Sequence, residues 1–325
     1  MNAVLERLRP APYRGDITAA GAIPLALSAI VIDLRMTQWS TGIRLAVVAG
    51  IAILILAMGW LTPLDGPAPT QYHSMLLIAG LLPLLLALQL LAEVLGANSY
   101  PPPFAGAGRL AWTFAAEALA ALACARRANS AACTLIAALA AAVAVESGVR
   151  WIFGGDLGTI RLVLFLLSLC FAAGAVRLRD GQRRHAVSLV NAAGLAALTL
   201  GATYVIAITL SAQATRSGFS DVQSFVFGAA SGPAGWELYL LAIGFGLIGY
   251  AGSDREPGPA YLGVLVLLSF AVMAGSGHRT LLGWPLVLLA LGVVGLVIGL
   301  RPSTPAPPPP PTTVAPTIPL GRDRS

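Results

Sequence analysis

Ten long apolar stretches occupy most of this chain between Ile17 and Leu300, and they constrain its fold more than any other feature. Asp, Glu, Lys and Arg make up only 10% of the residues, too few to cover the surface of a water-soluble protein of this size. A helix needs about 20 apolar residues to cross about 30 Å of hydrocarbon. The sequence therefore predicts an all-α, polytopic membrane bundle of about ten transmembrane helices. The ten predicted spans are residues 17–33, 45–64, 75–95, 110–125, 131–149, 158–176, 186–210, 235–252, 259–276 and 281–300.

The arginines indicate how these spans are oriented. All 20 basic residues are Arg, and with ten spans and an internal N-terminus 13 of them fall on the cytoplasmic side. This excess follows the positive-inside rule, which explains the net charge of +6 better than nucleic-acid binding does. Five of the six tryptophans then lie at the outer interface, which indole rings favour. We expect both termini to be cytoplasmic.

Three segments follow from this topology: a cytoplasmic N-terminus (1–16), a ten-span transmembrane domain (17–300) and a Pro-rich cytoplasmic tail (301–325). The tail holds nine prolines between Pro302 and Pro319, a composition typical of extended and disordered chain. Its PxxP spacings offer a docking site for a protein partner, and a solvated tail without a partner is the alternative. The external loops are expected at residues 98–108 and 213–232, the second with a short amphipathic helix.

Glu117 is the most costly residue of the chain to place in a membrane, because it lies at the centre of the predicted span 110–125. A charge at that depth costs at least about 2.5 kcal/mol, so we expect the side chain to face the bundle interior or to be protonated. One interpretation is a carboxylate that couples transport to a proton or a cation. The other is a neutral Glu hydrogen-bonded to a neighbouring helix, with Thr113 one turn away on its own helix.

A second group of charges maps to the outer ends of the predicted spans. Its members are Asp33, Glu93, Glu146, Arg150 and Glu237, with Arg161 nearby. Glu146 and Arg150 are four residues apart and share a helix face, so they can pair. The group predicts either an external vestibule for a cation or polar ligand, or the ordinary charges that end membrane spans.

The remaining motifs predict no catalytic residue, cofactor site or metal site. The sequence GFGLIG at residues 244–249 fits the dinucleotide fingerprint GxGxxG, but it lies inside an apolar span with no strand before it. We interpret these glycines as a smooth helix face for close packing. The three cysteines lie in spans without a metal-ligand spacing, and the three histidines fall on both sides of the membrane.

The sequence favours a carrier or permease-like protein for a small solute, with the lipid bilayer as its surroundings and no nucleic-acid partner. The alternatives are a non-catalytic scaffold that binds a protein partner and a membrane-embedded enzyme that uses outer-face carboxylates. The abundance of Arg, Ala, Gly and Pro, with no Lys, is typical of a GC-rich bacterial genome. We therefore expect a multi-pass protein of a bacterial cytoplasmic membrane.

Overall fold

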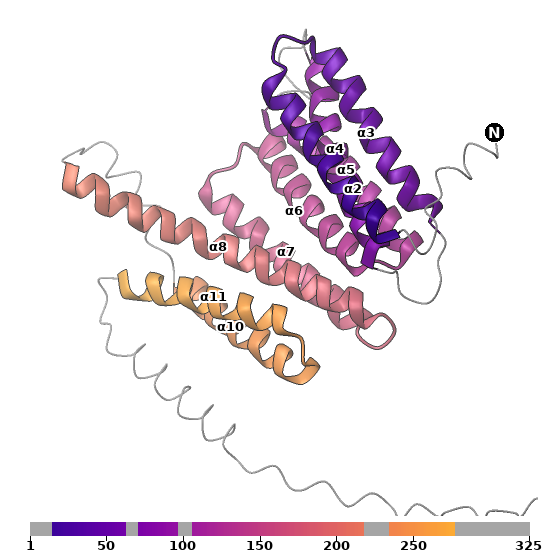
Figure 1. Cartoon of the computed structure of the whole chain (residues 1–325). Helices are drawn as coiled ribbons and strands as arrows, with labels where there is room; N and C mark the ends of the chain where they lie inside the picture. Colours follow the sequence, from indigo (N-terminus) through magenta and orange to yellow (C-terminus); the bar gives the residue numbers. More distant parts are fainter. Residues whose placement is uncertain (1–14, 63–70, 97–105, 218–233, 277–325) are drawn as a thin grey trace, which may run out of the picture. The chain divides into compact units, whose positions relative to one another are not determined.

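The computed structural model describes residues 15–62, 71–96, 106–217 and 234–276, and every regular element in these ranges is a helix (Figure 1). The helices are α2 (Gly15–Arg35), α3 (Thr41–Leu61), α4 (Gln71–Gly96), α5 (Gly106–Ala128), α6 (Ala131–Phe153), α7 (Leu157–Leu178), α8 (Arg183–Ser217), α10 (Ala234–Asp254) and α11 (Pro257–Ser276). This confirms the all-α fold class.

Eight of the described helices are long and apolar enough to cross a membrane, which is roughly consistent with about ten spans. The described helix outside this set is α5, whose 23 residues include Arg109, Glu117, Arg126 and Arg127. At 1.5 Å per residue it is about 34 Å long, so its charges and not its length set it apart. The tenth predicted span (281–300), the N-terminal residues 1–14 and the Pro-rich tail lie outside the described residues.

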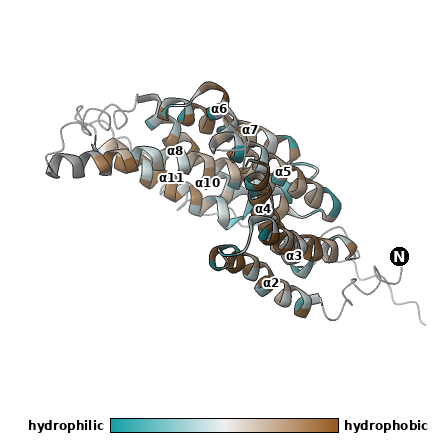
Figure 2. Ribbon diagram, turned by 90° about the horizontal axis from the view of Figure 1, so that it is seen from above, coloured by the Kyte–Doolittle hydropathy of each residue, from teal (hydrophilic) through white to brown (hydrophobic). Residues whose placement is uncertain are grey.

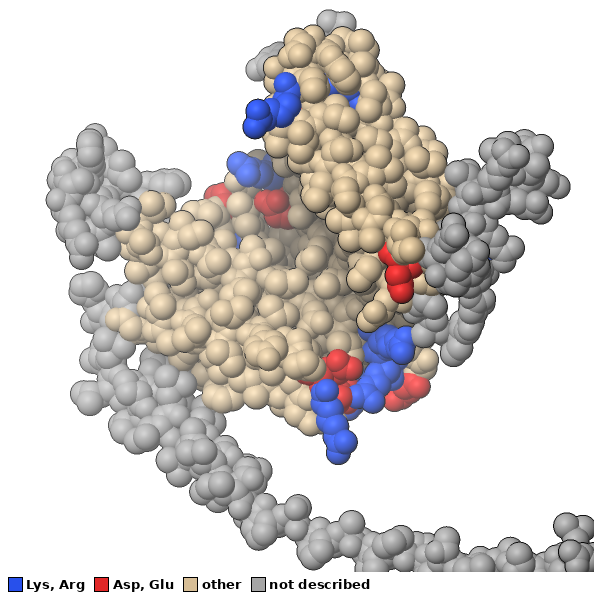
Figure 3. All heavy atoms as spheres, in the orientation of Figure 1, with Lys and Arg blue, Asp and Glu red and all other residues tan. Residues whose placement is uncertain are grey.

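Large apolar side chains face outward along these helices, as the bilayer requires. Ile53, Leu119 and Val176, from three different helices, are 65%, 68% and 75% exposed. Brown, apolar residues are prominent along α3 and α4 in Figure 2. In Figure 3 the uncharged surface is broad, and the red and blue side chains gather in a few groups. A water-soluble protein would bury such side chains, whereas lipid tails solvate them.

Helices α2 to α6 pack against one another through small residues. α3 runs along α4, α5 runs along α6, and α2 and α5 also contact α4 (Figure 1). One buried cluster joins α4, α5 and α6. Its members are Leu77, Leu81, Ala121, Cys124, Ala125, Ala128, Cys133 and Ala137. Alanine and cysteine in this cluster let the helix backbones approach closely, as is typical of helix packing in membranes.

The remaining described helices, α7, α8, α10 and α11, pack in two close pairs, with α11 also against α8. The GxGxxG sequence lies within α10, in agreement with its interpretation as a helix face. A Cβ on Gly244 would come within 2.7 Å of Leu267, and one on Gly263 within 2.7 Å of the Gly244 carbonyl oxygen. Gly246 and Gly249 face open space. Only the first glycine of the motif therefore serves close packing within the described residues.

Hydrogen bonds join the beginning of α8 to the first turn of α6 and to Asn129, which lies between α5 and α6. The His185 ring lies between Thr134 Oγ1 (2.5 Å from Nδ1) and Asn129 Oδ1 (2.7 Å from Nε2). Ser188 Oγ donates to the Ala131 carbonyl oxygen at 2.7 Å. Asn129 has a positive φ of 53°, which asparagine tolerates better than most residues and which ends α5 before α6 begins. These contacts connect the two groups of helices at one end.

Two loops are shorter than the sequence suggested. α5 begins at Gly106 and α8 continues to Ser217, so residues 106–108 and 213–217 are helical and not loop. The other residues of both predicted loops, including the predicted amphipathic helix beyond Ser217, lie outside the described residues.

Candidate functional site

Glu117 lies on the buried face of α5 and is 3% exposed. The same face carries Thr113 one turn before it and Ala121 one turn after it, both fully buried. Ala121 belongs to the cluster that α5 forms with α4 and α6, so the carboxyl group lies at the edge of packed protein. Its Oε2 atom is buried and has no hydrogen-bond partner among the described residues. A buried oxygen of this kind costs free energy, which makes the residue a candidate for function.

Thr113 connects the Glu117 face of α5 to α4. Its Oγ1 donates to the Arg109 carbonyl oxygen at 2.8 Å and accepts a hydrogen bond from Gln89 Nε2, also at 2.8 Å. The Gln89 Oε1 atom in turn accepts from Arg109 Nε at 2.8 Å. Gln89 therefore bridges two α5 residues that are one turn apart, Arg109 and Thr113.

Glu93 extends this line to the ends of three helices. It follows Gln89 by one turn on α4, so both side chains lie on one helix face. Thr41 Oγ1 donates to Glu93 Oε1 at 3.3 Å, and Arg44 Nη2 lies 3.8 Å from the same oxygen. Arg44 Nη1 also forms an ion pair with Asp33 Oδ1 at 2.9 Å. One guanidinium thus holds α2, α3 and α4 together through two carboxylates.

We name this set the α4–α5 polar chain. It consists of Asp33, Arg44, Glu93, Gln89, Arg109, Thr113 and Glu117. It runs from helix ends that the sequence places at the outer face to the middle of α5. With every group ionised it holds three acids and two arginines. In a hydrocarbon environment such polar groups need partners, and each member before Glu117 has one that the structure describes.

The structure therefore brings Asp33 and Glu93 together around Arg44, but it does not bring the other outer-face candidates to them. Glu146 is half-buried and Arg150 is exposed, and the salt bridges of the described residues do not include this pair. Glu237 lies in the first turn of α10. Its neighbours on that helix, Trp236 and Tyr239, pack edge-to-face on Phe165 of α7 with ring centroids 5.6 and 4.8 Å apart.

Arg161 is more deeply buried than the other outer charges, which are half-buried or exposed. It is 6% exposed, its guanidinium carbon lies 3.4 Å from the centre of the Tyr204 ring, and its Nε donates to Thr203 Oγ1 at 3.0 Å. The outward neighbour Asp156 instead caps α7, where its side chain accepts hydrogen bonds from the hydroxyl and the backbone N–H of Thr159. These two hydrogen bonds hold the pKa of Asp156 below its ordinary value.

The sequence pattern alone does not indicate Arg44, Gln89 or Arg109 as parts of a site. Gln89 carried a usable signal, since it is the amide nearest the end of the apolar run 75–95 and precedes Glu93 by four residues. Arg44 and Arg109 were counted only as loop charges, although each lies within the first turn of a helix. Among the described residues no group of three or more His, Cys, Asp or Glu is arranged to hold a metal ion.

Comparisons with protein-family models, with curated proteins and with solved structures give no match to this chain. The function is therefore argued from the residues themselves.

Proposed function

We propose that this membrane protein is a carrier for a small solute and that Glu117 is its coupling carboxylate, which takes up a proton or a small cation. The observation that carries the proposal is the burial of Glu117 with one carboxyl oxygen unpartnered among the described residues. A residue retained there at such a cost is by default a functional candidate in a membrane helix.

The α4–α5 polar chain supports a route to this carboxylate. Its members form two bonded groups, Asp33–Arg44–Glu93 and Arg109–Gln89–Thr113. Glu93 and Gln89 are one turn apart on α4, and Thr113 and Glu117 are one turn apart on α5. In the proposal, a proton or cation arriving from the end with Asp33 and Glu93 neutralises Glu117. Once Glu117 is neutral, the helices can move it past apolar side chains during transport. The charged carboxylate would resist this movement, because a charge costs at least about 2.5 kcal/mol at mid-membrane.

The surrounding assignments belong to the same proposal. Both termini lie in the cytoplasm, the protein resides in a bacterial cytoplasmic membrane, and the tail 301–325 is available to a protein partner. The enzyme alternative is less well supported. Asp33 and Glu93 are both held by Arg44, and the ion pairs of the described residues do not bring Glu146 or Glu237 to them.

Ion flux into reconstituted vesicles tests the proposal. Purified full-length protein is placed in vesicles that contain a pH-sensitive dye, and internal pH is followed after an imposed proton gradient, with Na⁺ and K⁺ gradients as parallel arms. We expect wild-type protein to carry flux in at least one arm. Glu117→Gln is expected to lower that flux at least tenfold, to the level of protein-free vesicles, with unchanged expression and thermal stability.

The matched control is Asp180→Asn, which removes an exposed acid in the turn between α7 and α8. It is expected to keep wild-type flux. Wild-type flux in Glu117→Gln, or absence of flux from wild-type vesicles in all three arms, would contradict the carrier proposal.

A further inference from the structure

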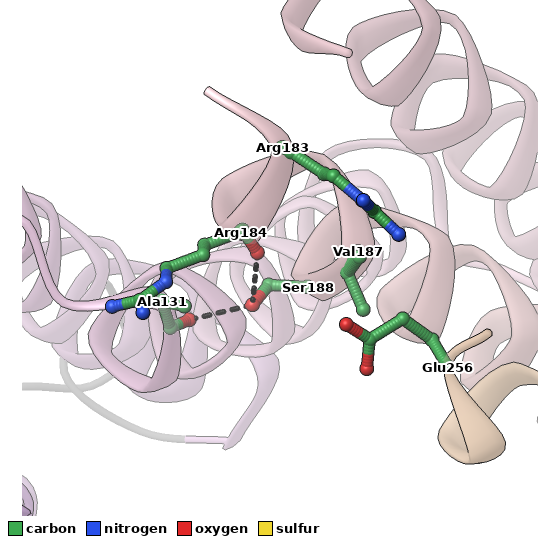
Figure 4. Close-up of a pocket in the computed structure, with 6 residues that line it drawn as sticks. All are labelled: Ala131, Arg183, Arg184, Val187, Ser188 and Glu256. Carbon is green, nitrogen blue, oxygen red and sulfur yellow. Dashed lines mark hydrogen bonds between the residues drawn. The ribbon is translucent and has the colours of Figure 1, made fainter. Parts of the chain in front are cut away.

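A pocket of about 500 Å³ opens at the opposite end of the helices from Asp33 and Glu93, and it shares no residue with the α4–α5 polar chain. Six residues of three segments line it (Figure 4): Ala131, Arg183, Arg184, Val187, Ser188 and Glu256. They come from the first residue of α6, the first turns of α8 and the turn between α10 and α11. Its volume lies within the range of about 300–1,000 Å³ that is usual for small-ligand sites.

The pocket wall is fixed by hydrogen bonds. Ser188 Oγ donates to the carbonyl oxygens of Ala131, at 2.7 Å, and of Arg184, at 3.3 Å, and so ties α8 to α6 (Figure 4). Arg183 Nη2 donates to the carbonyl oxygen of Asp254, the last residue of α10. Arg179 holds the Asp254 carboxylate at 3.0 Å. Three helices therefore hold Arg183 and Ser188 in place before any ligand arrives.

Two opposite charges at this pocket lack partners among the described residues. Among the described residues, no hydrogen bond or ion pair involves the guanidinium of Arg184 or the carboxylate of Glu256. In Figure 4 the two side chains extend from different sides of the pocket, with Val187 and Ser188 between them. The charges do not neutralise each other, so a ligand that satisfies both must carry both signs.

We propose that this pocket binds a phosphate ester that bears a primary amine, such as the phosphoethanolamine headgroup of a lipid. Arg184 binds the phosphate oxygens, for which guanidinium is well suited. Arg183 extends to the other side of Ser188 (Figure 4) and stays on the Asp254 carbonyl oxygen. Glu256 accepts hydrogen bonds from the ammonium group. The helix ends that carry the pocket are expected at the cytoplasmic interface, the depth at which lipid headgroups lie.

A purely anionic ligand fits the pocket less well, because its charge would meet the Glu256 carboxylate. A quaternary ammonium headgroup fits less well for another reason, since it has no N–H to donate. The site is therefore expected to prefer phosphatidylethanolamine to both phosphatidylglycerol and phosphatidylcholine. The preference separates this site from the general attraction of basic residues for anionic lipid, which would favour phosphatidylglycerol.

Native mass spectrometry of the full-length protein in detergent, titrated with each of these three lipids, tests the proposal. We expect phosphatidylethanolamine to bind at least about fivefold more tightly than either other lipid. Arg184→Gln should weaken its binding about tenfold, as expected for loss of a charge-assisted contact. Glu256→Gln should abolish the preference over phosphatidylglycerol while leaving phosphatidylglycerol binding equal or stronger. Both residues are partly or fully exposed, so neither change should unfold the protein.

Arg177→Gln and Asp180→Asn are the matched controls, because both residues are exposed and lie at the same helix ends outside the pocket. They should bind as wild type does. Isothermal titration with soluble O-phosphoethanolamine distinguishes the source of the ligand: heat that depends on Arg184 and Glu256 assigns the site to a free ester, and its absence with lipid binding retained assigns it to a lipid. Wild-type lipid and ester binding in both pocket variants, equal losses in the controls, or no preference for the amine-bearing headgroup would overturn the proposal.

Discussion

Glu117 of α5 and Arg161 of α7 are both charged residues with buried side chains, and their surroundings differ. Arg161 lies 3.4 Å over the centre of the Tyr204 ring and donates to Thr203 at 3.0 Å. Glu117 keeps one carboxyl oxygen without a hydrogen-bond partner among the described residues. A buried charge with partners on the adjacent helix is suited to holding two helices together. A buried carboxyl group with an oxygen that lacks a hydrogen-bond partner is suited to exchanging a proton or a ligand.

The helix packing also differs between the α8–α10–α11 interface and the α4–α5 interface. Helices α8, α10 and α11 approach so closely that an added Cβ on Gly201, Gly244 or Gly263 would come within 2.8 Å of a neighbouring atom. At one end of the α4–α5 interface, the side chains of Gln89, Arg109 and Thr113 form hydrogen bonds between the helices instead. We infer that substitutions cost more stability in the first interface than in the second, and the following variants test this difference.

Replacing Arg161 with alanine should have the largest effect on stability. It removes the stacking on Tyr204, worth about 2 kcal/mol when desolvated, and a charged hydrogen bond to Thr203, so we expect the free energy of unfolding to fall by about 3 kcal/mol. Reversible unfolding of the protein in mixed detergent micelles measures the change. Tyr204→Leu should cost less in the Arg161→Ala background than in wild type, because the stacking has already been lost.

The control for this prediction is Arg177→Ala on the same helix, where the side chain is exposed. It should change the free energy of unfolding by no more than about 0.5 kcal/mol. If Arg161→Ala lowers the free energy of unfolding no more than the control does, Arg161 has no structural role. The contrast between Arg161 and Glu117 would then fail.

Gly263→Ala should have the second largest effect, a loss of about 2 kcal/mol, as is usual for overpacking. The new Cβ would lie 2.7 Å from the Gly244 carbonyl oxygen and 2.8 Å from Ile248 Cγ1, and the backbone oxygen cannot rotate away. Gly246→Ala on α10 is the matched control, since its Cβ would meet nothing within 4 Å. The control should leave stability unchanged or raise it by up to about 1 kcal/mol. Equal effects of both changes would show that close packing is not what these glycines provide.

The sequence predicted the membrane fold well because one physical rule, the length of apolar chain that spans a bilayer, decides most of it. It also predicted the burial of Glu117, since a charge in a span must avoid lipid. Residues 1–14 and 277–325 lie outside the described part of the chain, so the topology and the tail stay predictions. The close packing at Gly244 followed from its place in an apolar span, but the sequence could not tell it from Gly246 and Gly249.

The sequence could not predict which charges meet. Arg44 contacts Asp33 at the end of the preceding helix and Glu93 on α4, and the packing of these three helices decides that the charges meet. Arg161 looked like a charge at a span end because Tyr204, its partner, is 43 residues later and reads as one more aromatic residue in an apolar run. Glu146 and Arg150 share the spacing of a helical ion pair, but the ion pairs of the described residues do not include them. Arg150 is exposed, and an ion pair open to solvent gains little free energy.

Glu117→Gln should have the smallest effect on stability and completes the comparison. The amide keeps the shape of the side chain and removes a group that is costly in hydrocarbon, and Oε2 has no described hydrogen bond to lose. We therefore expect the free energy of unfolding to stay within about 1 kcal/mol of wild type, with any change in the stabilising direction. Glu117→Ala adds a cavity and should cost more stability, so the difference between the two variants separates the effect of packing from that of charge.

If Glu117→Gln lowers the free energy of unfolding as much as Arg161→Ala does, both residues have the same structural role. Glu117 would then be one more contact between helices. Retained stability together with lost ion flux would instead mean that the carboxyl group is kept for its chemistry, because a side chain of equal shape supports the fold without it.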